Sequence, residues 1–342
     1  MPPIQPSLRG SLLTGASALA MSISGSGAQA QNASSQISPP VPTQWTVWAE
    51  GALFNTVGGS YNIPSIPGLG APFTSFNPQA GWEAAVGFDY RSASDPAWHF
   101  VFDFRYGRSR PATSNSSSSF TTFSTNFTFS PPLVTETTNT SATHATEREG
   151  HLVADLMIGR DFNLGGADPQ FQFGLRFADL WAAARAEENG STTTTSFYEG
   201  ETSTEASDPV TSSAIATWNS HFFGVGPRVA ITGGVPIAGS WTFDYEAGVA
   251  ALFGNRSFDY KLTSSTFSTV TDPQYPSPLV VVFNADAWVA LSYYLTPYTK
   301  VSAGIRTDYY NAALTTYNIN TGGLESISRD YWGPFVRLTG SF

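Results

Sequence analysis

Residues 82–91 read Trp-Glu-Ala-Ala-Val-Gly-Phe-Asp-Tyr-Arg, and apolar and polar side chains alternate along the stretch. In an extended chain the aromatic and aliphatic residues fall on one face, and Glu83 and Asp89 fall on the other. The same period of two recurs in residues 98–106 and 241–253. Alternation over this length predicts β-strands and not helices.

Ten segments of the chain show this alternation. Most exceed the roughly 5–6 residues of a strand in a soluble sheet and reach the roughly 9–11 residues that a tilted strand needs to cross a bilayer. A soluble sandwich with an aromatic core is the alternative, but it does not need strands of this length. The segments are 44–54, 80–91, 97–109, 148–162, 169–185, 219–235, 240–258, 283–295, 299–311 and 331–342.

Short and long connections alternate strictly between these segments. Transmembrane barrels have short periplasmic turns and long extracellular loops. The sequence therefore predicts an all-β, antiparallel, up-and-down transmembrane barrel of about ten strands, with both ends in the periplasm. Residues 118–130 lack an apolar face, and we interpret them as a hairpin above the membrane. Twelve strands is the alternative. The short connections are 92–96, 163–168, 236–239 and 296–298, and the long ones are 55–79, 110–147, 186–218, 259–282 and 312–330.

The first thirty residues have the pattern of a secretory signal. Arg9 supplies a positive charge, residues 12–23 are apolar, and Ala28-Gln29-Ala30 has the small-x-small form of a cleavage site. The predicted organisation is a signal peptide (1–30), a periplasmic linker (31–43) and an outer-membrane barrel (44–342) in a Gram-negative bacterium.

Composition excludes several classes of function. The chain has no cysteine, which rules out disulfide scaffolds and thiolate metal sites. Its net charge of −10 argues against nucleic acid as a partner. No nucleophile elbow, phosphate loop or histidine metal motif occurs, so we expect no enzyme, no cofactor and no metal. His151 and His221, with Glu147 and Glu149 near the first, are better explained as solvated rim residues than as catalytic groups.

One face of each strand is predicted to line the lumen. Charges in lipid cost about 2–4 kcal/mol at the bilayer midplane, so charged residues of the strands must point inward. Such a lining either selects ions and small solutes or forms an arginine–carboxylate network that braces and blocks the barrel. The predicted lining residues are Glu83, Asp89, Asp103, Arg105, Asp155, Arg176, Arg228, Asp244, Glu246, Asp286, Arg306, Asp308 and Arg337.

Aromatic residues gather at the predicted strand ends. Such rings form the interfacial girdles of transmembrane barrels. The chain also ends on Phe342, which resembles the terminal strand signature that the outer-membrane assembly machinery reads. The predicted inner girdle comprises Trp45, Tyr90, Trp98 and Trp241, and the outer girdle comprises Trp82, Tyr106, Phe253, Tyr309 and Trp332.

Residues 222–235, Phe-Phe-Gly-Val-Gly-Pro-Arg-Val-Ala-Ile-Thr-Gly-Gly-Val, resemble a signature of the Legionella-type major outer membrane protein family. Trp48-Ala-Glu-Gly-Ala-Leu-Phe54 and Gly333-Pro-Phe-Val-Arg337 support the resemblance. The similarity spreads over most strands and is absent from the long loops. The family is described as pore-forming, so the resemblance implies a porin and no catalytic residue.

The sequence thus favours a porin that lets ions or small hydrophilic solutes diffuse across the outer membrane. The alternative is a closed barrel that acts as an adhesin or structural anchor through its loops. Residues 112–147 contain 19 Ser or Thr in 36 positions and no Lys or Arg, typical of a solvated loop. By length, residues 110–147 are also the candidate for a loop that folds into the lumen. The expected partners are the lipid bilayer, the assembly machinery and solutes or ions, and the chain acts as a monomer or a trimer.

Overall fold

The computed structural model describes residues 45–63, 74–92, 94–162, 169–198, 205–265, 270–272, 279–318, 320–321 and 323–342. All of them belong to one compact unit, Ile37–Phe342. The predicted signal peptide (1–30) and linker (31–43) lie outside the described residues. In the described part of the chain, no helix is long and apolar enough to cross a membrane.

Ten antiparallel strands form a closed ring, as the alternation predicts. Each strand pairs with the next along the chain, and the last pairs with the first. The ring is β1 (Trp45–Gly58), β4 (Gly81–Arg91), β5 (Trp98–Ser109), β7 (Leu133–Asp161), β8 (Gln170–Tyr198), β10 (Val210–Ala238), β11 (Trp241–Ser264), β13 (Val280–Thr296), β14 (Thr299–Asn318) and β15 (Gly323–Ser341).

The outward face carries the apolar side chains of these strands. On β10, for example, Phe223, Val229 and Ile231 are exposed, while their preceding neighbours Phe222, Arg228 and Ala230 are buried. An exposed apolar band around a closed ring suits hydrocarbon, where every backbone polar group needs a partner within the protein. The fold is therefore a transmembrane β-barrel.

The short connections lie at one end of the barrel and bring both chain ends there. Residues 239–240 join β10 to β11, and Gly239 has a φ of +56°, which residues with a side chain rarely adopt. Trp45 and Phe342 exchange two backbone hydrogen bonds, from Trp45 N to Phe342 O (3.1 Å) and from Phe342 N to Trp45 O (2.9 Å). We call this the short-turn end and the opposite end the outer mouth.

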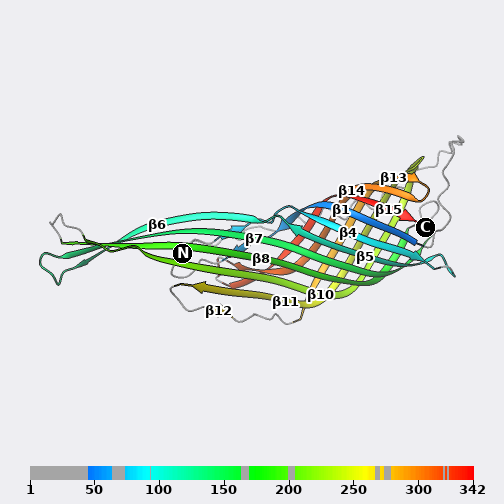
Figure 1. The fold of residues 1–342 in the computed structure, drawn as a ribbon. Helices are drawn as coiled ribbons and strands as arrows, with labels where there is room; N and C mark the ends of the chain where they lie inside the picture. The colour runs from blue at the N-terminus through cyan, green and yellow to red at the C-terminus, as the bar shows by residue number, and fades with distance from the viewer. Residues whose placement is uncertain are drawn as a thin grey trace, which may run out of the picture. The chain divides into compact units, whose positions relative to one another are not determined.

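Several strands continue far beyond the apolar band at the outer mouth. β7, β8 and β10 each have 29 residues, about twice the predicted lengths of their segments. β6 (Ala112–Asn126) pairs with the Leu133–Glu147 half of β7 and forms no part of the ring. The hairpin interpretation is thus confirmed, and the twelve-strand alternative is wrong. We call β6 and the outer parts of β7, β8 and β10 the outer sheet; Figure 1 shows it extending from the crossing strands of the barrel.

The outer sheet corrects two expectations about the long connections. Residues 112–126 and 133–147 are strands joined by a turn and not a solvated loop, because Thr favours strands even without an apolar face. They also do not fold into the lumen, since most of β6 is exposed. Two short pairings extend this region: β9 (Glu205–Ala206) pairs with β8, and β12 (Val270–Asp272) pairs with β11.

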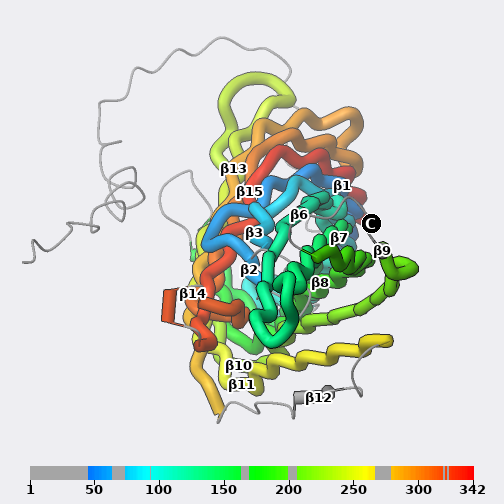
Figure 2. The backbone as a smooth tube through the Cα atoms, turned by 90° about the vertical axis from the view of Figure 1, so that its left-hand side faces the viewer, coloured from blue at the N-terminus to red at the C-terminus, as the bar shows by residue number. Residues whose placement is uncertain are grey.

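A different segment enters the outer mouth. The hairpin of β2 (Tyr61–Ile63) and β3 (Thr74–Phe76) belongs to the first long connection, and its side chains Tyr61, Ile63 and Phe76 are buried. The amide N of Asn62 donates to Thr316 Oγ1 at 2.7 Å, which ties the hairpin to β14. Figure 2 shows β2 and β3 between β14 on one side and β6 and β7 on the other.

A bulge in β14 brings that strand inward as well. The register with β15 shifts between Tyr310 and Leu314, and Ala312 adopts a φ of 53°. Bulges bend the strand that carries them. Beyond the bulge, residues 313–316 are all buried, and the Thr315 amide donates to Ser220 Oγ of β10 at 2.7 Å. Strands three places apart in the ring therefore touch across the mouth.

Candidate functional site: the barrel interior

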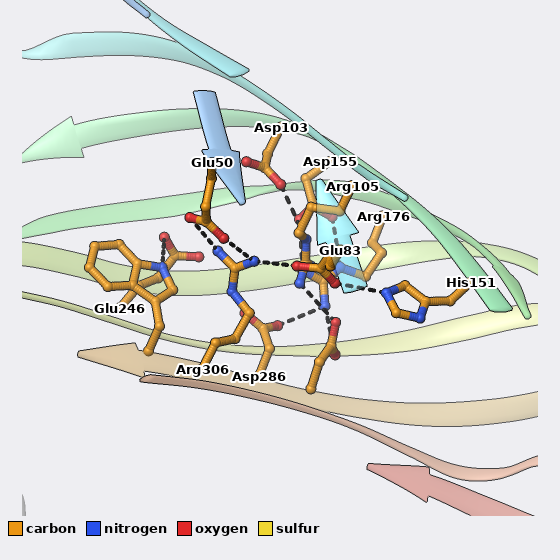
Figure 3. A network of polar contacts seen from close by, with 12 residues as sticks. Glu50, Glu83, Asp103, Arg105, His151, Asp155, Arg176, Glu246, Asp286 and Arg306 are labelled. Carbon is orange, nitrogen blue, oxygen red and sulfur yellow. Dashed lines mark hydrogen bonds and ion pairs between the residues drawn. The ribbon is translucent and has the colours of Figure 1, made fainter. Parts of the chain in front are cut away.

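The middle of the barrel holds a layer of buried ion pairs. Arg176 on β8 has an exposed fraction of 0%. Its Nε and Nη2 donate to the two carboxylate oxygens of Asp155 at 2.7 Å each. Its Nη1 donates to Asp286 Oδ1 of β13 at 2.7 Å and to Asn284 Oδ1 at 2.5 Å. One guanidinium thus connects two walls of the barrel, as Figure 3 shows.

Arg105 extends this layer to the far wall. Arg105 Nη1 lies 3.0 Å from Asp308 Oδ2, and Arg105 Nε lies 3.2 Å from Asp103 Oδ1. β5 and β14, which carry Arg105 and Asp308, are separated in the ring by three strands, so this pair spans the lumen.

Two further arginines connect the same layer to β1, β4 and β11. Arg306 Nη1 lies 2.6 Å from both Glu83 Oε1 and Glu50 Oε1. Arg228 Nη2 lies 2.6 Å from Asp286 Oδ2 and 2.8 Å from Glu246 Oε1. Arg228 shares Asp155 and Asp286 with Arg176, and Arg306 is an electrostatic neighbour of Arg105. We call the pairs of these four arginines the central network.

All thirteen predicted lining residues make polar contacts in the interior, although not all belong to the central network. Lys300 Nζ and Ser292 Oγ contact Asp244 Oδ2 near the short-turn end, at 2.5 and 2.6 Å. Asp89 pairs there with His99 at 2.9 Å. Arg337 Nε donates to Glu50 Oε2 at 2.8 Å. The role of this lining in solute passage remains a prediction.

Several interior residues escaped the sequence analysis. Glu50 and His99 have the inward phase of their predicted strands, so alternation would have found them. Glu149, expected at the solvated rim, is instead buried. Arg329 lies just before the predicted start of the last strand at residue 331, so the alternation of that strand does not include it. Its Nε and Nη2 donate to Glu149, with Nε to Oε2 at 2.7 Å, across the three strands that separate β15 from β7.

An apolar layer lies between the central network and the outer sheet. Leu180, Trp218, Phe222 and Leu252 point inward from β8, β10 and β11 and are almost fully buried. The hairpin side chains Tyr61, Ile63 and Phe76 belong to the same cluster. A run of buried alanines on β8 and β10 leaves room for them. We call this cluster the mouth core.

The two rim histidines do not form one site. His151 is buried, not solvated as expected, and its Nε2 lies 2.7 Å from Glu83 Oε2. His221 points outward from the barrel, and its Nε2 lies 2.7 Å from Asp179 Oδ1. The two imidazoles therefore occupy opposite faces of the wall. Among the described residues, no group of three or more His, Asp or Glu could hold a metal ion.

Glu147 is a buried carboxyl group above the apolar band, next to the mouth core. It is 2% exposed, and neither of its oxygens has a hydrogen-bond partner among the described residues. Burial, reinforced by the charge of Glu149 and opposed by that of Arg329, raises the pKa of Glu147 to about 8. Burial also raises the pKa of the neighbouring Tyr61 phenol.

The first prediction concerns Glu147→Gln. Between pH 5 and pH 8 the folded state holds a proton that the unfolded state releases, so the free energy of unfolding falls as pH rises through this window. The amide of Glu147→Gln is uncharged at every pH in this window, so the free energy of unfolding of the variant does not fall in this way. We expect the variant to match the wild type at pH 5 and to exceed its stability by about 1–3 kcal/mol at pH 9. Thermal unfolding in detergent at both pH values measures this, and equal midpoints at pH 9 would contradict it.

The predicted girdle residues lie on the outward face near the two barrel ends. Trp45 stacks on Tyr90 with ring centroids 4.7 Å apart at the short-turn end, and Trp82 and Tyr106 are 5.8 Å apart at the outer end. Their role as bilayer anchors remains a prediction. The exposed members of the set are Trp45, Trp82, Trp98, Trp241, Phe253, Tyr309, Trp332 and the terminal Phe342.

No family model matches the chain, and no curated protein matches it. Among solved structures, it is similar to the outer membrane protease OmpT of Escherichia coli, with 13% identity, a TM-score of 0.42 and coverage of 87% of this chain and 97% of that one. It is also similar to Neisserial surface protein A, with 12% identity, a TM-score of 0.24 and coverage of 88% of this chain and 98% of that one. A third similar structure is a Pseudomonas aeruginosa FadL homologue, with 10% identity, a TM-score of 0.26 and coverage of 87% of this chain and 90% of that one. At identities and TM-scores this low, these likenesses assign no activity to the chain.

Proposed function

We propose that this protein is a closed, non-enzymatic barrel of the Gram-negative outer membrane that holds the outer sheet at the cell surface as an anchor or adhesin. The observation that carries the proposal is the burial of Arg176, which bonds to acids on two walls of the lumen with no exposed surface. A water-filled pore at this level would leave the guanidinium partly exposed.

Two layers in series support a closed lumen. The central network fills the middle of the barrel, and the mouth core fills the part above it. Barrels near eight strands are filled by their own side chains, whereas aqueous channels are typical of 16–18 strands. Ten strands lie near the small end of this range.

The outer sheet supports the surface role. β6 is a long, exposed strand rich in Ser and Thr, and Phe120, Phe123 and Phe127 are exposed near its tip. This proposal also includes a signal peptide at residues 1–30 and recognition of Phe342 by the assembly machinery. The barrel is proposed to act as a monomer or a trimer.

A passive porin is the second candidate. Asp89, Asp103 and Glu246 have side chains that are 20%, 18% and 20% exposed, which supports a partly water-filled space beside the central network. Acids in such a space would favour cations if the network opened. The resemblance to the Legionella-type family points the same way.

Single-channel recording tests the closed barrel. We expect the refolded chain without residues 1–30 to insert into a planar bilayer and show no open steps, because the central network and the mouth core stand in series across the proposed closed lumen. Heat-modifiable migration on gels shows that the sample is folded. Stable cation-selective steps would contradict the closed barrel and establish the porin.

Surface labelling serves as the companion control for orientation. An epitope inserted at residues 127–130, between β6 and β7, is expected to bind antibody on intact cells. The same epitope at 239–240 is expected to bind only after permeabilisation. The reverse result would contradict the assigned orientation.

A further inference from the structure

Three arginines form a diagonal row on the outward face of β5, β7 and β8. Arg108 is paired in register with Gly150, and Arg148 lies two residues further along β7. Arg148 is paired with Ala183, and Arg185 lies two residues further along β8. Diagonal neighbours of this kind are about 7–8 Å apart, within reach of long side chains.

These arginines lack an internal explanation. Within the described residues, the side chains of Arg108 and Arg148 make no hydrogen bond or ion pair, and Arg110, two residues after Arg108, is exposed and equally unpaired. Arg185 contacts Glu187 at 2.7 Å, in a pair about half exposed on each side. Like charges on neighbouring strands repel one another, and the long arginine side chains bring diagonal neighbours within reach. An anion from outside the chain would offset this repulsion.

A row of aromatic side chains indicates the depth of the arginines in a bilayer. Trp82, Tyr106 and Trp181 lie side by side, with centroid distances of 5.8 and 6.0 Å. Trp181 lies over Gly150, where a Cβ would meet its ring. Trp82 is paired in register with Arg108. Aromatic belts occupy the membrane–water interface, so the arginines stand at headgroup height.

Among the described residues, Glu187 is the one outward acid that contacts this row, through its half-exposed pair with Arg185. Asp179, one row lower on β8, is bound to His221 Nε2. Glu147 and Glu149, the sequence neighbours of Arg148, point into the barrel and are buried. Arginine binds phosphate oxygens through two parallel N–H donors, which makes a cluster of this kind suited to phosphate groups.

We propose that Arg108, Arg110, Arg148 and Arg185 bind the phosphate groups of a phosphorylated glycolipid in the outer leaflet. The inference rests on the proposed outer-membrane placement, because only the outer mouth carries this row. A lipid with two phosphates on one headgroup can bridge several of the four guanidinium groups. A single inorganic phosphate lacks the acyl chains that would rest on the aromatic row.

Binding of diphosphoryl lipid A to the full-length chain in detergent tests the proposal. We expect it to raise the thermal unfolding midpoint of the wild type. The triple variant Arg108→Gln/Arg148→Gln/Arg185→Gln is expected to bind at least tenfold more weakly. The matched control is Arg160→Gln, which removes an outward arginine at the short-turn end of β7. We expect it to bind as the wild type does.

The outcomes separate the sources of phosphate. Unchanged binding by the triple variant would overturn the site. Equal, arginine-dependent binding of phosphatidylglycerol would overturn the glycolipid assignment, and equal binding of inorganic phosphate would overturn the lipid assignment. The assay runs in detergent without conductance or cells, so its failure is distinguishable from failure of the closed barrel or of its orientation.

Discussion

Arg176→Ala is expected to lower the free energy of unfolding by about 3–5 kcal/mol, because breaking a buried ion pair leaves uncompensated charges behind. Arg176 is bound to Asp155 through two 2.7 Å contacts and to Asp286 through one. The alanine removes these contacts. Asp155 then keeps its longer contacts with Arg228 (3.7 Å) and Arg105 (3.9 Å), and Asp286 keeps its contact with Arg228, so the buried carboxylates lose much of their compensating charge. Denaturant unfolding in detergent micelles, followed by tryptophan fluorescence, measures the loss.

Two comparisons separate charge from packing. Adding Asp155→Asn to Arg176→Ala is expected to recover part of the loss, because it removes one of the uncompensated carboxylates. Arg91→Ala breaks a partly exposed pair with Asp161 and is expected to cost about 0–1 kcal/mol. A loss below 1 kcal/mol for Arg176→Ala would mean that water screens the site, and it would favour the porin.

Trp218→Ala is expected to cost about 3–5 kcal/mol, as truncation of a large buried aromatic does. Trp218 is 1% exposed in the mouth core and packs on Tyr260 with ring centroids 5.4 Å apart. If the mouth core excludes water, replacing Trp218 with alanine leaves an empty cavity. In a wet vestibule the indole would already be solvated, and its removal would cost little. The same unfolding assay therefore tests whether the mouth is filled.

Phe223→Ala is the matched control for Trp218→Ala. Phe223 is on the same strand, points outward and is 50% exposed. Its removal leaves no internal cavity, because detergent or lipid fills the space. We expect a clearly smaller loss than for Trp218→Ala. Equal losses for the two variants would contradict a packed mouth core.

The ring of ten strands could be predicted because lipid imposes a strict rule on one face. Trp82 and Val86 point outward within the apolar band, and Glu83 between them has only the interior left. No such rule governs the chain above the membrane. Thr193 and Thr194 on β8 lie opposite Thr138 and Thr137 on β7, yet their polar sequence contains no apolar period. The sequence therefore predicts the hairpin at residues 118–130 but not the continuation of β7, β8 and β10 above the membrane.

The interior network could be predicted in composition but not in connectivity. Alternation assigned Arg105 and Asp308 to the lumen, but it carries no information about which residues meet across a barrel. That depends on strand tilt and stagger. The inward hairpin was missed for another reason: Tyr61 and Ile63 stand in a long connection whose length resembles that of a solvated loop. Their burial follows from the space left by the alanines of β8 and β10.

The pairing of β1 with β15 has a consequence for how the chain folds. Thr46 and Ser341, which share a hydrogen bond at 3.1 Å, are 295 residues apart. Closing a loop of this length costs conformational entropy that grows with (3/2)RT ln n, and contacts of high sequence separation form slowly. Until that last pairing forms, the other nine can exist as an open sheet with β1 and β15 as two bare edges. Closure of the ring is then expected to be the slowest step of folding. The open sheet that precedes closure is expected to be the state most prone to aggregate.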